Sequence, residues 1–326
     1  MARLSVPLTA KGVELHLRGG NQLWRNLGSG RFEDITARAG VAVADRVPVT
    51  ASFADIDNDG DADLFVTSVR GGNVLFTNDG TGAFRDVTAQ AGVGLAKHSS
   101  GAVFLDYDRD GLVDLFVCNV GRYTSDLKGP DGAYAGLEDA FEGYQYPDRY
   151  EKPVLYRNRG QGRFEDVSAS AGPQPHGWAG DAIATDFNQD GWPDLFVLNM
   201  AGPQHYYENQ GGKAFVDKTK QFFPRGPMGA MGAATLDVNN DGRLDLFLTD
   251  MHADMVDLSA MPVAKEKVKA AGPGMGSAAN FIFGNALYQQ RADGSLAEVS
   301  DAMGVETYWP WGTSAKPRLI DVSRAI

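Results

Sequence analysis

The sequence predicts an all-β protein, a β-propeller of four-stranded antiparallel blades with about five blades in this chain. Three observations predict this class: a sequence unit that repeats along the chain, an acidic turn that recurs at one place in the repeat, and a high glycine content. Glycine accounts for 40 of the 326 residues, above its average share of about 7%, which indicates many tight turns. A β-sandwich would also contain such hairpins, but sandwiches do not normally repeat their sequence.

One unit of the repeat occurs five times, most clearly in residues 73–93 and 21–41. Its weaker copies are residues 154–173, 204–219 and 285–305. A second unit alternates with it in residues 53–66, 104–117, 184–197 and 235–248. Joined in order, the two units supply four short strands, which is the content of one propeller blade. We therefore expect one propeller domain over residues 1–326, with blades at 50–93, 101–173, 180–219 and 230–305.

Each strand of the predicted blade has its own place in the repeat. The first strand, such as Gly101–Leu105, contains small residues, as expected where blades converge on a crowded axis. The second strand, such as Asp114–Val117, is apolar on both faces, which is typical of a strand enclosed between neighbouring blades. The third and fourth strands correspond to Val74–Thr77 and Phe84–Val87 in the clearest copy.

The spacing of the acidic turns indicates insertions within two blades. The turns start at Asp55, Asp106, Asp186 and Asp237, so successive turns are separated by 51, 80 and 51 residues. The long interval contains an insertion at residues 121–152, between the second and third strands of its blade. A comparable insertion occupies residues 252–284 of the fourth copy.

The two ends of the chain leave the blade number open. Residues 12–26 align with residues 63–78, so the first blade is expected to begin at its second strand. Residues 312–315 resemble another first strand, but no acidic turn follows them. Either residues 310–326 complete a composite blade with residues 1–41, or the chain is a fragment of a larger propeller, for example one with seven blades.

The acidic turns predict metal sites. Each turn fits the pattern Asp-x-[Asp/Asn]-x-Asp-Gly-x-x-Asp, in which the side chains at positions 1, 3, 5 and 9 and the carbonyl at position 7 can surround one hard cation. The predicted ligands are Asp55, Asp57, Asp59, Asp61 and Asp63; Asp106, Asp108, Asp110, Leu112 and Asp114; Asp186, Asn188, Asp190, Trp192 and Asp194; and Asp237, Asn239, Asp241, Arg243 and Asp245. Calcium fits best, because it accepts about 6–8 oxygens in flexible geometry. We therefore expect about four Ca²⁺ sites.

An alternative explanation of these turns is that Asp-Gly simply favours a hairpin. Four matches at one blade position favour metal binding instead, because the packed carboxylates would repel one another without a cation. The first two turns contain four ligand aspartates each and the other two contain three each, which makes fourteen and exceeds the net charge of −12. The acidity of the chain is thus mainly that of its predicted metal sites.

With these motifs the chain resembles the FG-GAP/VCBS repeat propellers, which include integrin α-chain propellers. It resembles more closely the group of cartilage acidic protein and ASPIC/UnbV-type proteins. The matching segments are residues 55–66, 73–78 and 84–88. The resemblance implies calcium-stabilised blades, a role in cell adhesion or ligand recognition, and an extracellular or periplasmic location, although residues 1–12 contain no apolar leader segment.

Composition and motifs exclude several other functions. A net charge of −12 argues against a general nucleic-acid binder, which needs a basic face. No stretch approaches the roughly 18 apolar residues of a membrane-spanning helix. The single cysteine, Cys118, cannot form an intrachain disulfide. The sequence also lacks a nucleophile elbow, a P-loop and a Rossmann glycine cluster.

The loops opposite the predicted calcium turns indicate a ligand face. The candidates on it are His98, His176, Trp178, His252 and Trp309. The simpler interpretation is a set of scattered loop histidines with aromatic packing. We expect a non-enzymatic module that binds a protein or glycan; the alternative is a metal-dependent polysaccharide lyase or sugar dehydratase that uses the insertion face.

Overall fold

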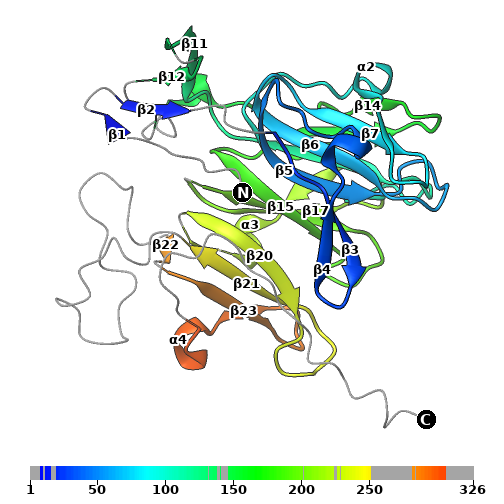
Figure 1. Ribbon diagram of the computed structural model, residues 1–326. Helices are drawn as coiled ribbons and strands as arrows, with labels where there is room; N and C mark the ends of the chain where they lie inside the picture. The colour runs from blue at the N-terminus through cyan, green and yellow to red at the C-terminus, as the bar shows by residue number, and fades with distance from the viewer. Residues whose placement is uncertain are drawn as a thin grey trace. The chain divides into compact units, whose positions relative to one another are not determined.

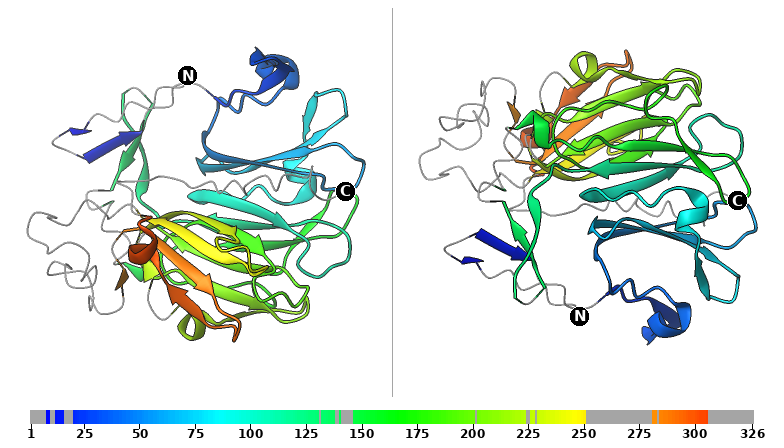
Figure 2. Two further views of the ribbon diagram at one scale, coloured as in Figure 1. Left: turned by 90° about the horizontal axis from the view of Figure 1, so that it is seen from below. Right: turned by 90° about the horizontal axis from the view of Figure 1, so that it is seen from above.

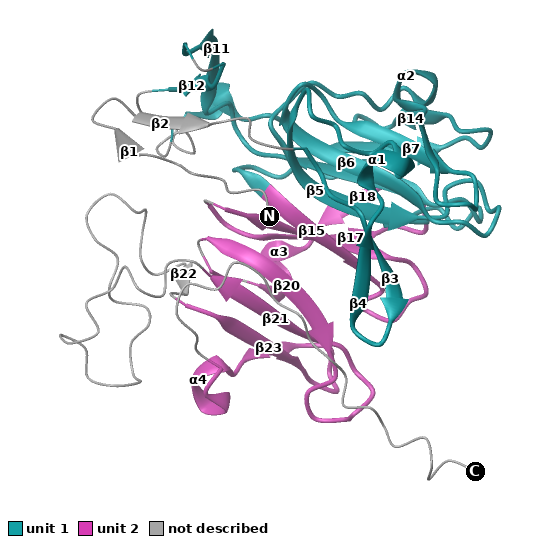
Figure 3. Ribbon diagram, viewed as in Figure 1, with its two compact units in different colours: residues 1–179 teal, residues 180–326 magenta. Residues whose placement is uncertain are grey.

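The computed structural model describes residues 8–9, 12–15, 20–130, 132–137, 140, 146–200, 202–223, 226–227, 229–250, 281–282 and 284–305. Strands account for most of the regular structure, and the described helices are single turns (Figure 1). The chain divides into two compact units, residues 1–179 and 180–326 (Figure 3), and each is described by itself. None of the helices in the described part of the chain is long and apolar enough to cross a membrane.

Two four-stranded antiparallel sheets of unit 1 have the strand order of a blade. The first consists of β5 (Val47–Ala54), β6 (Asp63–Arg70), β7 (Val74–Asn78) and β8 (Phe84–Asp86). The second consists of β9 (Ser99–Leu105), β10 (Asp114–Asn119), β13 (Val154–Asn158) and β14 (Phe164–Asp166). In both sheets, chain order and spatial order agree, as in a propeller blade.

Unit 2 repeats this arrangement. Its first sheet consists of β15 (Ala179–Thr185), β16 (Asp194–Asn199), β17 (His205–Asn209) and β18 (Phe215–Asp217). Its second consists of β20 (Ala230–Leu236), β21 (Asp245–Asp250), β23 (Ala286–Gln290) and β24 (Leu296–Glu298). Two further strands of unit 2, β19 (Gly226–Pro227) and β22 (Phe281–Ile282), form a short parallel pair. In the chain, β19 comes directly before β20 and β22 directly before β23. The predicted all-β class with four-stranded antiparallel blades is confirmed.

The second strand of each of these four sheets is the most buried. In β10 the side chains of Leu115, Phe116 and Val117 are fully buried. Within unit 1 the first two sheets lie face to face (Figure 2), and one apolar cluster joins Phe65 and Leu75 of the first sheet to Leu115 of the second. A corresponding cluster joins the two sheets of unit 2. Enclosure on both faces explains why the three residues after the first aspartate of each of these strands are apolar.

A single helical turn follows the fourth strand in several repeats. These turns are α1 (Thr36–Ala39), α2 (Thr88–Ala91), α3 (Thr219–Phe222) and α4 (Ser300–Met303). In α2 the Thr88 hydroxyl accepts the Leu75 backbone N–H at 2.9 Å, and Asp86 Oδ1 accepts the Thr88 N–H at 2.9 Å. This Asp-x-Thr pattern ties the end of the fourth strand to the start of the third.

The N-terminal strands differ from the expected partial blade. The strand β2 (Gly12–Leu15) was expected to lie beside β3 (Trp24–Gly28), but β3 pairs with β4 (Arg31–Asp34) alone. Instead β2 pairs with β1 (Leu8–Thr9) and with β12 (Tyr134–Gly136), which forms a hairpin with β11 (Thr124–Lys128) inside the 121–152 insertion. The exposed edge of that hairpin offers unpaired backbone groups, which β2 satisfies. Residues 306–326 and residues 252–280 and 283 of the second insertion lie outside the described residues.

Candidate metal centres

Each acidic turn connects the first and second strands of one sheet, and all four have the same backbone shape. The residues at position 4 have left-handed φ angles between 56° and 61°; these are Asn58, Arg109, Gln189 and Asn240. The glycines at position 6 have φ between 83° and 92°; these are Gly60, Gly111, Gly191 and Gly242. Such angles are costly for residues other than glycine. The loops therefore hold a left-handed conformation at position 4, although the sequence motif allows any residue there.

The aspartate at position 1 holds this conformation. In every loop its two carboxylate oxygens accept the backbone N–H groups of positions 5 and 6, at 2.8–3.1 Å. These aspartates are Asp55, Asp106, Asp186 and Asp237. The aspartate at position 5 accepts the N–H of position 7 at 2.9–3.0 Å, which involves Asp61, Leu112, Trp192 and Arg243. The loop therefore curls around its own carboxylates.

The aspartate at position 9 anchors the loop to the sheet. Its four copies, Asp63, Asp114, Asp194 and Asp245, are at most 1% exposed. One oxygen of each accepts the N–H of position 2, at 2.8–3.3 Å. The other oxygen accepts a backbone N–H from the end of the third strand, at 2.7–2.9 Å. Burial raises the pKa of Asp114 to about 7 and that of Asp194 to about 6, because it disfavours the charged form.

Two of the loops gather three carboxylates each. In the first loop one oxygen each of Asp55, Asp57 and Asp63 lies within 4.8 Å of the others, and Asp106, Asp108 and Asp114 do the same in the second loop. Burial and the neighbouring carboxylates of Asp59 and Asp55 raise the pKa of Asp57. These two clusters are therefore able to hold a metal ion, and they consist of the oxygen ligands that calcium prefers.

An unpartnered oxygen supports this fit. Asp108 Oδ1 is buried and has no hydrogen-bond partner among the described residues. A buried polar atom without a partner is costly and rare in folded proteins. A cation in the second loop would satisfy it.

The second loop also contains an internal cation. The Arg157 guanidinium, from β13, lies 2.6 Å from Asp108 Oδ2 and 3.0 Å from Asp110 Oδ2. The corresponding position in the first sheet is Thr77, which brings no charge. Arg157 therefore already neutralises part of the second loop, which the sequence motif did not reveal.

The third and fourth loops replace one carboxylate by an amide. Asn188 Nδ2 donates to Asp190 Oδ2 at 3.0 Å, and Asn239 Nδ2 donates to Asp241 Oδ2 at 2.7 Å. In the fourth loop the Arg243 side chain also contacts Asp241. Burial opposes ionisation of Asp241, but its hydrogen bonds from Arg243 and Asn239 outweigh it and lower the pKa. These loops therefore relieve their carboxylate repulsion internally.

Neighbouring loops within each unit are linked by an amide. In unit 1, Asn58 Nδ2 of the first loop donates to the Gly111 carbonyl of the second at 2.9 Å. In unit 2, Gln189 Nε2 donates to the Gly242 carbonyl at 2.9 Å. Asn158 Nδ2 further joins the second sheet to the Ile56 carbonyl of the first loop at 2.8 Å. The two units thus repeat one pattern of contacts between loops.

Comparison with known proteins agrees with this repeated loop. The family model of the FG-GAP-like repeat matches residues 15–66, 55–117, 136–197 and 186–248. These matches cover more than half of the chain, and each ends with the second strand after an acidic loop. The chain belongs to the FG-GAP-like repeat family.

Curated relatives of this FG-GAP-like chain share one name, cartilage acidic protein 1. The mouse (Mus musculus) protein is 27% identical over 225 residues, which is 66% of this chain and 29% of the relative. The Xenopus tropicalis protein is 27% identical over 203 residues, covering 60% and 27%. The human (Homo sapiens) protein is 37% identical over 103 residues, covering 30% and 15%. The chain spans less than a third of the length of these relatives.

The structure brings together two of the predicted ligand-face residues. The Tyr123 ring lies between His98 and Trp178, with ring centroids 4.9 Å from His98 and 6.2 Å from Trp178. Both His98 and Trp178 are buried, whereas His176 is exposed. His252 and Trp309 lie outside the described residues.

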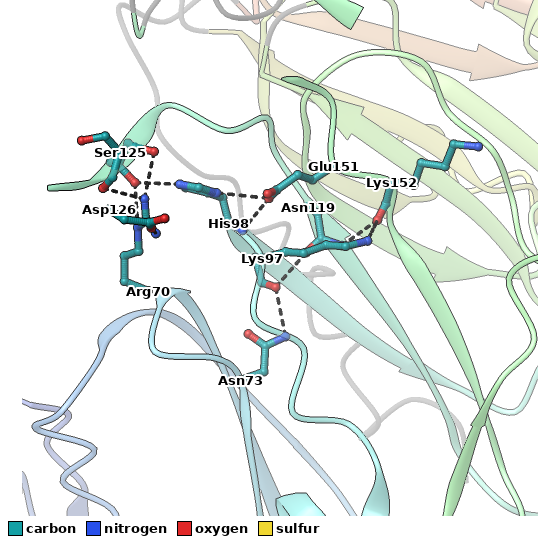
Figure 4. Close-up of polar contacts among 11 residues, drawn as sticks. Arg70, Asn73, Lys97, His98, Asn119, Ser125, Asp126, Glu151 and Lys152 are labelled. Carbon is teal, nitrogen blue, oxygen red and sulfur yellow. Dashed lines mark hydrogen bonds and ion pairs between the residues drawn. The ribbon is translucent and has the colours of Figure 1, made fainter. Parts of the chain in front are cut away.

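His98 is the centre of a polar network that the sequence did not predict (Figure 4). Glu151 Oε2 accepts the His98 backbone N–H at 2.6 Å and lies 3.2 Å from His98 Nδ1. Burial opposes ionisation of Glu151, but these contacts with His98 outweigh it and hold the Glu151 pKa below its usual value. His98 Nε2 lies 2.7 Å from Thr124 Oγ1, which also accepts the Arg70 Nε–H at 2.8 Å. Because an ionised carboxylate only accepts hydrogen bonds, the contact with Glu151 places a proton on His98 Nδ1.

Proposed function

We propose that this chain is a calcium-binding FG-GAP-type propeller module that serves adhesion or ligand recognition outside the cytoplasm. The observation that supports calcium binding is the convergence of three carboxylates within 4.8 Å in each of the first two loops. The buried, unpartnered oxygen of Asp108 supports it further. Because calcium neutralises clustered carboxylates, the ion would stabilise the connection between the first and second strands of each blade.

The four loops are expected to bind calcium with different affinities. The first loop has three converging carboxylates, and no side-chain cation contacts them in the described structure. The second loop has the same carboxylates, but calcium there competes with Arg157. The third and fourth loops contribute one fewer charge, and their position 5 aspartates accept an amide N–H. The expected order is therefore the first loop, then the second, then the other two.

Calcium titration of the chelator-treated full chain tests the proposal. Isothermal titration calorimetry is expected to show calcium uptake at more than one site, with weaker uptake of magnesium. A ligand that binds only the folded state adds about 2.7 kcal/mol per site at a hundredfold excess over Kd, so EDTA is expected to lower the melting temperature. Replacing Asp57 and Asp108 by Asn should remove most of this calcium-dependent stability, because it removes one ligand charge from each of the first two loops.

The matched control is the double variant Glu33→Gln and Asp148→Asn, which removes two negative charges from exposed positions outside the loops. It is expected to keep the calcium dependence of the wild type. A melt that does not respond to EDTA, together with no calcium uptake, would contradict the proposal.

A further inference from the structure

A cavity of about 670 Å³ lies beside the 121–152 insertion in unit 1. Its wall combines the end of β6, the segment before β9, the hairpin β11–β12 and Glu151. Its volume lies within the range of small-ligand pockets, about 300–1,000 Å³. All of its lining residues belong to one unit and to the described part of the chain.

The charge of this cavity is opposite to that of the chain. Arg70, Lys97, Arg122 and Lys128 line it, against two carboxylates, Asp126 and Glu151. The lining is therefore net positive in a chain whose net charge is −12. The cavity is therefore a local site of attraction for an anion.

Arg70 is held by hydrogen bonds within the cavity wall, whereas Arg122, Lys97 and Lys128 keep N–H donors for a ligand. The Arg70 guanidinium donates to the Thr124 hydroxyl, to the Thr124 and Ser125 carbonyls and to Asp126, at 2.6–2.8 Å (Figure 4). The exposed guanidinium of Arg122 has no side-chain hydrogen bond or ion pair with the described residues. The Lys128 ammonium lies 4.6 Å from the centre of the Tyr134 ring, and Arg70 lies 4.8 Å from the same ring.

The base of the cavity is held by buried polar contacts. His98, 4% exposed, connects Glu151 to Thr124 and fixes the insertion against the start of β9. Lys97 Nζ donates to the Lys152 carbonyl at 3.3 Å, and Asn119 Nδ2 donates to the same carbonyl at 2.8 Å (Figure 4). These contacts order the backbone that carries the cations, which lowers the entropic cost of binding a ligand.

From this arrangement we infer that the cavity binds an acidic sugar, that is, a carboxylate or sulfate group on a hydroxylated ring. The inference deepens the proposed function, because it assigns a ligand class to the recognition role. Arg122, Lys97 and Lys128 would hold the anionic group, since charge-assisted hydrogen bonds are the strongest available. Asp126 Oδ1 already accepts a hydrogen bond from Arg70, and Glu151 Oε2 accepts one from His98, but the second oxygen of each carboxylate can accept a sugar hydroxyl.

An acidic peptide fits these features less well. Its carboxylates match the cations, but an extended peptide offers only one backbone N–H donor per about 3.3–3.6 Å of chain, whereas a sugar ring carries several hydroxyl donors beside its anionic group. Two cations already contact the Tyr134 ring, so it is not offered for stacking with a peptide aromatic group.

Binding of defined oligosaccharides to the full chain tests the inference. Calorimetric titrations in calcium-containing buffer would compare a uronic-acid oligosaccharide, a sulfated oligosaccharide, a neutral one of equal length and a hexaglutamate peptide. We expect binding of one or both acidic sugars that weakens as salt is raised, and the two acidic arms separate carboxylate from sulfate as the preferred group. The double variant Arg122→Gln and Lys128→Gln should weaken it at least about tenfold, which corresponds to about 1.4 kcal/mol.

The control variant Arg31→Gln and Lys213→Gln removes the same charge from exposed positions elsewhere. It should bind like the wild type, and an equal loss in both variants would indicate a general charge effect and overturn the inference. Arg122→Gln alone serves if the double variant is less stable. Binding of the neutral sugar equally well, preference for hexaglutamate, or no binding of either acidic sugar would also overturn it. Calcium uptake without sugar binding would refute this inference alone, whereas sugar binding without calcium uptake would refute the calcium part of the proposed function.

Discussion

Arg157 places a positive charge against the second acidic loop, where the first loop has Thr77 at the corresponding strand position. The guanidinium contacts Asp108 and Asp110, two predicted ligands, and its pKa is raised by these carboxylates although burial opposes the charged form. Calcium binding to this loop must therefore displace or share this contact. The Arg157 side chain thus decides how much the second loop needs a bound ion to offset the repulsion between its carboxylates.

Replacing Arg157 by Thr should strengthen calcium binding to the second loop and weaken the metal-free fold. We expect the calcium affinity of the second loop to rise about tenfold, since the ion would no longer compete with a guanidinium. The metal-free protein should lose about 1 kcal/mol in its free energy of unfolding, because the ion pair is partly exposed. Calorimetry and chemical denaturation measure the two effects. Arg159→Thr, which removes an exposed contact with Glu165, is the control; a weaker affinity in Arg157→Thr would contradict the competition.

Glu151 gives the fold a dependence on low pH. Its folded-state pKa is lowered, so its ionised form stabilises the fold above the unfolded pKa, and this contribution disappears as pH falls through the folded value. Glu151→Gln keeps an acceptor but cannot titrate. The variant should be less stable than the wild type by about 1 kcal/mol at pH 7, and the difference should shrink below about pH 4.3. Urea denaturation at a series of pH values measures it, and a constant difference would contradict the assignment.

The motif residues were predictable because they lie close together in the chain. Glycine at position 6 and aspartates at alternate positions can be read from nine consecutive residues. The partners of these residues could not be read in this way: Asp114 receives the N–H of Asn158, 44 positions away, across an insertion. For the same reason the sequence missed Arg157 and Glu151, whose contacts with Asp108 and His98 depend on how the insertion folds back.

At the scale of the elements, the repeated strands were predicted correctly where a strand is buried on both faces. Burial imposes a continuous apolar pattern on β6, β10, β16 and β21, and the structure shows nearly all of their residues buried. The sequence did not predict that β2 pairs with β1 and β12, because a strand of four residues is too short to carry a pattern that specifies its neighbour. The neighbour of such a strand depends on which other sheet has an unpaired edge strand, and this is decided only when the chain has folded.

The Asp-x-Thr turn should contribute measurably to each blade. In Thr88→Val the Leu75 backbone N–H loses its acceptor, and an unsatisfied, partly buried donor costs about 1–2 kcal/mol. Thermal or urea unfolding measures the loss. Thr81→Val removes a hydroxyl that contacts only Asp79 in an exposed hairpin, and it should change stability by less than about 0.5 kcal/mol. Equal effects of the two substitutions would show that the turn has no special role.

At the scale of the whole molecule, each unit contains a pair of four-stranded blades whose acidic loops are linked in the same way. The polar residue at position 4 of the first loop donates to the position 6 carbonyl of the second, through Asn58 in unit 1 and Gln189 in unit 2. The same residues are in the left-handed conformation. The pair of loops, and not the single loop, is therefore the unit whose backbone must be ordered.

This link makes the two loops of a unit partners in binding. Ordering one loop around an ion fixes the amide that holds the next, so the second ion meets a loop whose entropy is already reduced. Calcium binding within a unit should then show positive cooperativity, with a Hill coefficient between 1 and 2. Asn58→Ala should return the titration of unit 1 toward independent sites while leaving the ligand carboxylates in place. Such coupling would let a modest change in calcium concentration switch a blade pair between loose and ordered states.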